Sequence, residues 1–219
     1  MCAHPDLAAM RAVYARTGLD EASILADPLA QFARWMQDAI NAGLPEPNAM
    51  VLATATRDGV PSARTVLLKG VDERGFTFFT NTDSRKGAEL AANPRAALVF
   101  PWHALERQVR VSGPVSVVDR GEVGDYFASR PHGSQLGAWA SPQSQVISGR
   151  ADIDARLAEV AERWTEGDAV PLPDFWGGYR VAPEEVEFWA GREDRLHDRL
   201  RFRRDPDAPD GWLLERLAP

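Results

Sequence analysis

The spacing of apolar residues along the chain changes near residue 44. Before that point, one apolar face recurs at helical spacing and is formed by Leu29, Phe32, Met36 and Ile40. Asp27 is a good N-cap residue, Pro28 suits the first helical position, and Gly43 ends the pattern. The pattern predicts a helix here, and we expect residues 1–43 to form a helical N-terminal arm.

Short segments of β character dominate the rest of the chain. Strands are predicted at residues 49–56, 62–71, 75–81, 95–104, 106–118, 178–183, 185–191 and 194–204, with 211–219 closing the chain. Helices are predicted at residues 84–94, 121–131 and 151–167. Asp58-Gly59 is a hairpin signal between the first two strands. Hairpin-linked strands with late helices favour a mostly antiparallel β fold with added α-helices over a parallel α/β sheet.

Composition narrows the class of protein. A chain of 219 residues suits one structural domain, here with the arm at 1–43 and the main part at 44–219. The net charge of −7 disfavours nucleic acid as the main partner. Cys2 is the only cysteine, no apolar run is long enough to span a membrane, and the N-terminus lacks a secretory pattern. We therefore expect a cytoplasmic protein.

Several common catalytic motifs are missing from the sequence. It contains no G-x-G-x-x-G after a strand, no P-loop, no H-E-x-x-H and no G-x-S-x-G. The four histidines are far apart and none has a second ligand at metal-binding spacing. We therefore expect no catalytic metal.

The only two lysines among 25 basic residues lie close to arginines. Arg64 and Lys69 belong to one predicted strand. Arg85 and Lys86 follow the predicted cap Ser84, at a helix start where cations oppose the helix dipole. An anion bound to the free N–H groups and both side chains would reverse that penalty. The second group therefore indicates a phosphate site, whereas the first is equally consistent with a solvated strand.

Two further groups of polar residues suggest anion binding. Tyr126 and Arg130 are four residues apart and would share a helical face, with Ser134 after a turn. These three side chains form either a cage for one phosphate or an ordinary helix end. In the stretch GREDRLHDRLRFRRD, alternation would place five groups on one strand face: Arg195, His197, Arg199, Arg201 and Arg203. Such a row would repel itself, which indicates an anionic ligand or else a solvated edge strand.

Eight stretches in order resemble the pyridoxine/pyridoxamine 5′-phosphate oxidase family. They are LPEPNAM, RTVLLKG, FFTNTDSRKG, FPWHALERQVRVSG, YFASRPHGSQLGAWAS, PLPDFWGGYRV, EFWAGREDRLHDR and the terminal ERLAP. The resemblance runs from about Leu44 to Pro219. It implies an FMN-binding split β-barrel that works as a homodimer, with FMN at the subunit interface.

The resemblance also implies roles for individual residues. FMN would be bound by Arg64, Thr65, Val66, Leu67, Lys69, Phe79, Thr80, Arg85, Lys86, Gln108, Gln143, Ser144, Trp189 and Arg199. The substrate would be bound by Lys69, Tyr126, Arg130, Ser134, Arg195 and His197, of which Arg195 and His197 would be catalytic. Phe79 stands where the family often has tyrosine.

The implied reaction is oxidation at C4′ of pyridoxamine or pyridoxine 5′-phosphate. A hydride would pass to the flavin, giving pyridoxal 5′-phosphate, and dioxygen would reoxidise FMN and yield hydrogen peroxide. His197 would polarise or deprotonate the substrate. The alternatives are an oxidase of phenazine biosynthesis, a deazaflavin-dependent reductase on the same barrel, or a non-catalytic protein that binds flavin or pyridoxal phosphate.

Overall fold

The structure is a computed structural model that describes residues 18–219. Residues 1–17, which include Cys2, His4 and the start of the predicted arm, lie outside this range. The described residues divide into two compact units along the chain: unit 1 holds residues up to Pro47, Val99–Val111 and Glu185–Pro219, and unit 2 holds Asn48–Leu98 and Ser112–Glu184. The predicted boundary at residue 43 remains a prediction. No helix within 18–219 is long and apolar enough to cross a membrane.

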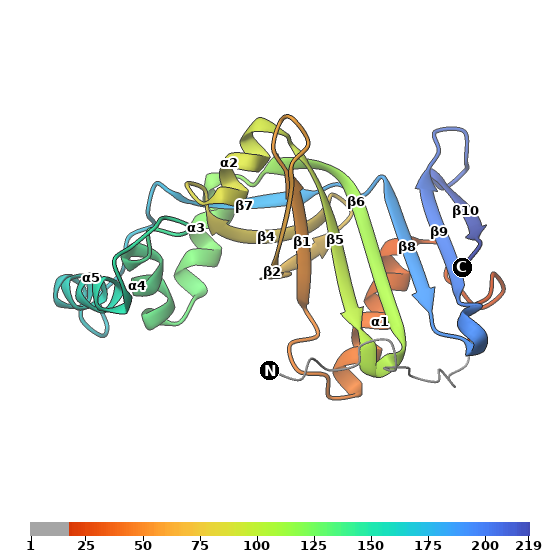
Figure 1. Ribbon diagram of the computed structural model, residues 1–219, viewed down its shortest axis with the longest axis horizontal. Coiled ribbons are helices and arrows are strands. Elements are labelled where there is room, and N and C mark those ends of the chain that lie inside the picture. Colours follow the sequence, from red (N-terminus) through yellow and green to blue (C-terminus); the bar gives the residue numbers. More distant parts are fainter. Residues whose placement is uncertain (1–17) are drawn as a thin grey trace, which may run out of the picture. The chain divides into compact units, whose positions relative to one another are not determined.

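Unit 1 packs the helix α1 (Pro28–Asn41) with strands of a sheet (Figure 1). Asp27 caps the helix as predicted, accepting hydrogen bonds from the N–H groups of Leu29 and Ala30 at 3.1 Å. The other elements are β8 (Glu185–Ala190), η3 (Glu193–Arg195), β9 (Asp198–Arg204), β10 (Trp212–Leu217), η2 (His103–Leu105) and parts of β5 and β6. β9 pairs antiparallel with both β8 and β10.

The core of unit 1 is aromatic. The Phe32 ring meets Phe100 edge-on at 4.9 Å, and Trp35 meets Phe188 at 5.2 Å. These side chains are almost wholly buried. The predicted helix is therefore confirmed, but its buried face differs from the predicted one. Phe32 is buried together with Trp35 and Ala39, whereas Ile40 of the predicted stripe is 51% exposed.

Unit 2 contains most of the remaining strands and the other helices (Figure 1). Its elements are β1 (Ala49–Ala55), β2 (Pro61–Leu67), β3 (Gly70–Asp72), β4 (Gly75–Asn81), α2 (Arg85–Ala92), α3 (Arg120–Ser129), α4 (His132–Ala140), α5 (Arg150–Arg163) and β7 (Trp176–Val181). The strands β5 (Arg95–Trp102) and β6 (Arg107–Val117) run through both units. β1 pairs with β2, and β4 pairs with β3 and β7, all antiparallel.

Two predictions of secondary structure in unit 2 need correction. The strand predicted at 62–71 is interrupted at Leu68 and Lys69, because β2 pairs with β1 whereas β3 pairs with β4. The change of partner places Lys69 in an exposed bend. The predicted turn before Ser134 is present at Arg130 and Pro131, but the helix that follows it, α4, was not predicted; its Leu136 and Ala138 join a buried core.

Candidate functional site

The start of α2 is a tightly built corner of unit 2. Ser84 caps the helix as predicted, and its hydroxyl accepts from the N–H of Gly87 at 3.4 Å. A side chain at Gly87 would come within 2.0 Å of the Thr82 carbonyl oxygen, so only glycine fits there. This close packing fixes Arg85 and Lys86 in the first helical turn.

Lys86 is a buried ammonium whose hydrogen bonds go to neutral oxygens. Its side chain is 7% exposed. Its Nζ donates to Gln143 Oε1 at 2.6 Å, Thr80 Oγ1 at 3.1 Å and Ser84 Oγ at 3.2 Å. Burial, with a smaller contribution from the Arg64 charge, lowers the pKa of Lys86 to about 8. The corner therefore holds a desolvated positive charge that an anion would stabilise.

Arg64 is fixed by the two strands of the β1–β2 pair. Its Nη1 donates to the Leu52 carbonyl at 3.1 Å and to Thr54 Oγ1 at 2.5 Å, and its Nη2 donates to Ser62 Oγ at 2.5 Å. The register places Leu52 opposite Arg64 and Thr54 opposite Ser62, so the partners lie on one face of the pair. The guanidinium is thus held in one orientation by the sheet.

Glu89 of α2 joins Arg64 to Arg85. Its Oε2 accepts from Thr54 and Ser62 at 2.5 Å and lies 3.3 Å from Arg64 Nη2. Its Oε1 accepts from Arg85 Nε at 2.8 Å. These donors outweigh burial and hold the pKa of Glu89 at about 2. The carboxylate is therefore ionised at neutral pH.

The cationic cradle, which we define as Arg64, Arg85 and Lys86 with Glu89, suits a phosphate group. Three cations and one carboxylate leave about two positive charges, and a phosphate monoester carries about −1.5 to −2 at pH 7. The helix N-terminus adds a dipole of the same sign. The structure thus brings together Arg64, Thr80, Arg85, Lys86 and Gln143 of the predicted cofactor residues.

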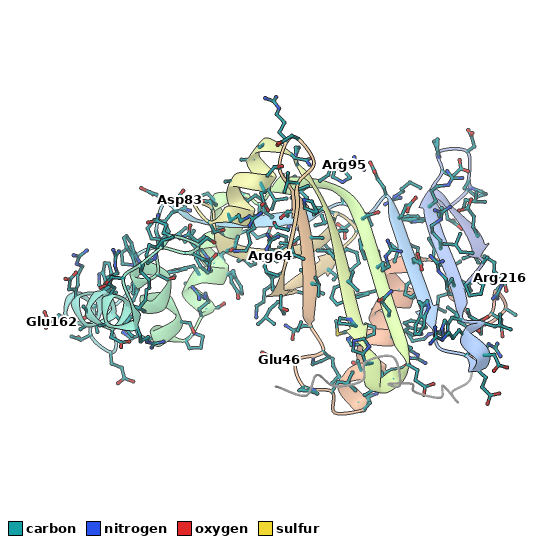
Figure 2. All side chains as sticks on the ribbon, in the orientation of Figure 1. Glu46, Arg64, Asp83, Arg95, Glu162 and Arg216 are labelled. Carbon is teal, nitrogen blue, oxygen red and sulfur yellow. The ribbon has the colours of Figure 1, made fainter. Side chains whose placement is uncertain are left out.

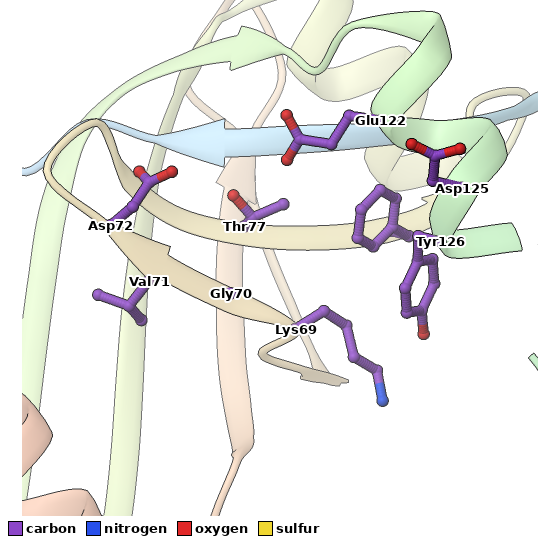
Figure 3. A pocket seen from close by; sticks show the side chains of 9 residues that line it. Lys69, Gly70, Val71, Asp72, Thr77, Glu122, Asp125 and Tyr126 are labelled. Atoms are coloured by element: carbon purple, nitrogen blue, oxygen red, sulfur yellow. The ribbon is translucent and has the colours of Figure 1, made fainter. Parts of the chain in front are cut away.

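Beside β3, β4 and α3 lies an open cavity of about 330 Å³ (Figure 3). Phe79 stacks on Tyr126 with ring centroids 4.0 Å apart and an interplanar angle of 10°, and Lys69 Nζ lies 6.0 Å from the Tyr126 centroid. The Lys69 amine and the Tyr126 hydroxyl extend to the same side of the cavity (Figure 3). The structure therefore brings Phe79, predicted to bind FMN, next to Lys69 and Tyr126, predicted to bind the substrate.

The same cavity also carries carboxylates that the sequence analysis did not include. Asp72 pairs with Arg74 at 2.5 Å, and Glu122 accepts from the buried Arg180 at 2.7 Å. Asp125 is exposed at the rim. Because Asp72 and Glu122 already have arginine partners, they leave the Lys69 charge available to a ligand.

Arg130 is the C-cap residue directly after α3 and has extended backbone angles. Its predicted position on the same helical face as Tyr126 stays a prediction. Its guanidinium lies 4.3 Å from the Trp176 ring centroid and 5.5 Å from that of Phe127. Its Nη1 is buried with no hydrogen-bond partner, and burial lowers its pKa. An unpaired buried donor of this kind favours an added acceptor such as an oxyanion.

The C-terminal arginines of unit 1 do not form the predicted single strand. Residues 193–195 make a short 3-10 turn in which Asp194 and Arg195 have φ values of 54° and 62°. β9 begins only at Asp198, so Arg195 and His197 are not aligned with the later arginines. His197 Nδ1 accepts from the Arg192 N–H at 3.1 Å, and its ring lies 4.6 Å from that of Trp189. This bond leaves the imidazole proton of neutral His197 on Nε2.

The β9 arginine row, Arg199, Arg201 and Arg203, is neutralised by glutamates of the neighbouring strands. Arg199 donates to Glu187 at 2.8 Å, Arg201 to Glu215 at 2.7 Å, and Arg203 lies 3.6 Å from Glu215. The expected mutual repulsion is therefore wrong for these three residues. Sequence reasoning counted only the acids within the run, whereas the partners come from β8 and β10.

The remaining predicted residues lie on several elements. Thr65, Val66 and Leu67 lie on β2, Gln108 on β6, Ser134 in α4, and Ser144 in a turn with φ of 72°. Their binding roles stay predictions. Sequence reasoning missed Glu89, Thr54 and Ser62. The four-residue spacing of Arg85 and Glu89 could have indicated an ion pair on the α2 helix.

Two family models together match most of the chain. The family model described as pyridoxamine 5′-phosphate oxidase matches residues 36–164. The model described as the pyridoxine 5′-phosphate oxidase C-terminal dimerisation region matches residues 176–219. The chain therefore belongs to the pyridoxamine 5′-phosphate oxidase family.

Two curated relatives cover nearly the whole chain. A pyridoxine/pyridoxamine 5′-phosphate oxidase from Nocardioides sp. is 60% identical over 216 residues, covering 99% of each chain. One of the same name from Rubrobacter xylanophilus is 58% identical over 217 residues, covering 99% of this chain and 98% of the relative. The family resemblance inferred from the eight stretches is thus confirmed.

Solved structures confirm the fold class. PhzG from Burkholderia lata, in complex with tetrahydrophenazine-1-carboxylic acid, has a TM-score of 0.84 and 34% identity, covering 90% of this chain and 95% of its own. A pyridoxamine 5′-phosphate oxidase-related, FMN-binding protein from Nostoc punctiforme has a TM-score of 0.70 and 17% identity, covering 90% and 100%. The mostly antiparallel split-barrel fold with added helices is therefore correct.

Proposed function

We propose that this protein is an FMN-dependent oxidase that converts pyridoxamine and pyridoxine 5′-phosphates to pyridoxal 5′-phosphate, with dioxygen as acceptor and hydrogen peroxide as product. We also propose that it acts as a cytoplasmic homodimer. The observation that carries the proposal is the buried Lys86 in the cationic cradle, with neutral hydrogen-bond partners. The family's dimerisation region at residues 176–219 supports the homodimer.

The cradle residues fit the phosphate of FMN. Arg64 and Arg85 present guanidinium groups already oriented by Glu89, and Lys86 supplies a third charge from the same corner. Thr80 and Gln143 hold the Lys86 ammonium in place. FMN, when bound, would accept the hydride removed from the substrate.

The substrate phosphate would bind near Lys69, Tyr126, Arg130 and Ser134. Arg130 has a buried Nη1 without a partner, and Lys69 lies beside the Tyr126 ring. Arg195 would orient the pyridine ring, since a guanidinium stays protonated while it contacts a planar partner. His197, with its proton on Nε2, would donate to a substrate oxygen and polarise it, and would not act as a base at that nitrogen.

Anaerobic spectroscopy tests the proposal directly. The purified protein loaded with FMN is mixed with pyridoxamine 5′-phosphate without oxygen, and the flavin band is followed. We expect bleaching, then recovery on exposure to air with pyridoxal 5′-phosphate formed. A flavin that stays oxidised would exclude this substrate, and failure to bind FMN would refute the cofactor assignment.

A second candidate function is oxidation of a phenazine precursor. The likeness to PhzG, at 34% identity and a TM-score of 0.84, favours it. The two functions differ in the substrate's phosphate. Bleaching by a reduced phenazine carboxylate and not by pyridoxamine 5′-phosphate would select the second.

A further inference from the structure

Glu89 is an unexpected residue in an anion site. A carboxylate beside Arg64 and Arg85 repels an incoming phosphate, yet Glu89 is only 5% exposed and ionised. Its hydrogen bonds to Thr54 and Ser62, both at 2.5 Å, tie it to the β1–β2 pair. These hydrogen bonds hold the Glu89 carboxylate in one position. It therefore acts on the neighbouring Arg64 and Arg85 from a fixed place.

We propose that Glu89 is a positioning residue of the FMN phosphate site, which orients Arg64 and Arg85 and sets the charge of the cradle to match a phosphate dianion. This inference rests on the proposed function for the identity of the ligand. It assigns Thr54 and Ser62 to the same unit, since each hydroxyl contacts both Glu89 and Arg64.

The geometry explains how one carboxylate orients two arginines. Oε2 of Glu89 faces Arg64 on β2, whereas Oε1 faces Arg85 one helical turn away on α2. Each guanidinium keeps further N–H groups beyond those used in these contacts. The Glu89 carboxylate therefore orients both guanidinium groups and leaves some of their N–H groups available for the phosphate.

The charge count explains why a carboxylate is tolerated. Without Glu89 the corner would hold three cations, and the buried Lys86 already has its pKa lowered by burial and by the Arg64 charge. With Glu89 ionised, the net charge of the cradle is about +2. The phosphate group of FMN carries a charge of similar size and opposite sign. An anion with a single negative charge would neutralise only about half of the cradle's positive charge.

The test compares FMN with riboflavin, which lacks the phosphate. The dissociation constants of both are measured by flavin fluorescence, and their ratio reports the phosphate contribution alone. In Glu89→Ala we expect this ratio to fall about tenfold or more, because both arginines lose their shared partner. In Glu89→Gln we expect a smaller fall, because the remaining amide oxygen still accepts from one of the two arginines and the negative charge beside the phosphate is gone.

Controls separate positioning from general damage. Glu162→Gln on the exposed α5 removes the same charge and should leave the ratio unchanged (Figure 2). Loss of fold alone would weaken both flavins equally. If Glu89→Ala does not fold, Thr54→Val removes one donor to Glu89 and should lower the ratio about threefold. An unchanged ratio in Glu89→Ala or in Thr54→Val, or an equal fall in Glu89→Ala and Glu89→Gln, would overturn the inference.

Failure of the cofactor assignment gives a different result. If the wild-type protein binds neither flavin, inorganic phosphate alone is titrated by calorimetry. The Glu89 inference then predicts weaker phosphate binding by Glu89→Ala than by Glu89→Gln. Identical affinities in the three proteins would overturn it independently of FMN.

Discussion

The cationic cradle and the β9 arginine row contain the same number of cations but different counter-charges. In the cradle, Arg64, Arg85 and Lys86 share one carboxylate, and Lys86 is bonded to neutral oxygens. In the β9 row, three arginines face three glutamates contributed by β8 and β10, of which Glu187 also pairs with Arg110 of β6. The row is prominent in the sequence, yet it is neutralised, whereas the less conspicuous cradle keeps a positive excess.

This difference shows that cation density alone does not identify an anion site. On a sheet, the cross-strand neighbour decides whether a charge is compensated, and that neighbour is distant in sequence. At a helix start, the dipole adds to the side-chain charges and the backbone N–H groups remain free. An anion therefore gains more at α2 than along β9.

The largest expected effect comes from Arg195, which belongs to the C-terminal arginine-rich run. It lies outside β9 in a turn with φ of 62°, so it is not part of the neutralised row. Arg195→Ala should lower turnover about 100-fold, because the substrate loses its orienting group. Flavin content by absorbance should stay at the wild-type level. Loss of flavin, or unchanged turnover, would contradict this role.

A smaller effect is expected on removing the cradle's buried lysine. Lys86→Met should weaken FMN binding about 30-fold, because a charge-assisted hydrogen bond contributes about 2 kcal/mol. The measurement is quenching of flavin fluorescence on titration with the apoprotein. Riboflavin, tested in parallel, should bind the variant and the wild type alike. If riboflavin binding falls equally, the lysine supports the fold and not the phosphate.

The pKa of Lys86 predicts a pH dependence of FMN binding. In the free protein this pKa is about 8, below its ordinary value of 10.5, so the ammonium is lost as pH rises through 8. FMN affinity should therefore fall above pH 8, by at most about tenfold per pH unit, whereas below pH 7 it should fall because the FMN phosphate takes up its second proton near pH 6. For folding the sign is opposite, since the unfolded chain binds more protons between pH 8 and 10.5 and stability rises there.

A matched variant isolates this titration. Lys86→Arg keeps its charge across the whole range, so its FMN affinity should not fall between pH 8 and 9.5. Binding is measured in one buffer series of fixed ionic strength. A decline of equal size in Lys86→Arg and the wild type would assign the pH dependence to another group.

The sequence was sufficient for elements whose signals are local. Ser84 as a cap, the α2 start and most strands followed from capping residues and alternation. α4 was missed because Gly133 and Gly137 are poor helix formers, and burial of its apolar residues overrides that propensity. Local helix propensity therefore fails to predict a helix that is stabilised mainly by packing of its buried side chains.

The sequence alone could not supply the partners of the charged residues. Lys86 meets Gln143 across 57 positions, and Arg64 meets Glu89 across 25. The compensation of Arg201 by Glu215 needs the register of β9 with β10. These contacts depend on how strands pair, which residue spacing does not encode. Family resemblance pointed to the cradle's cations, but the carboxylate that orders them appeared only in the structure.

The smallest expected effect tests the neutralised row itself. Arg203 lies 3.6 Å from Glu215, with the two side chains 41% and 28% exposed, so the pair is solvent-screened. Arg203→Gln should change the free energy of unfolding by less than about 1 kcal/mol, because exposed ion pairs contribute little. FMN affinity and turnover should stay within about twofold of wild type, as measured by denaturant unfolding, flavin titration and steady-state assay. A loss of FMN affinity comparable to that of Lys86→Met would instead mean that the β9 arginines bind an anion despite their glutamates. The contrast between the two regions would then have to rest on geometry, since charge compensation would no longer distinguish them.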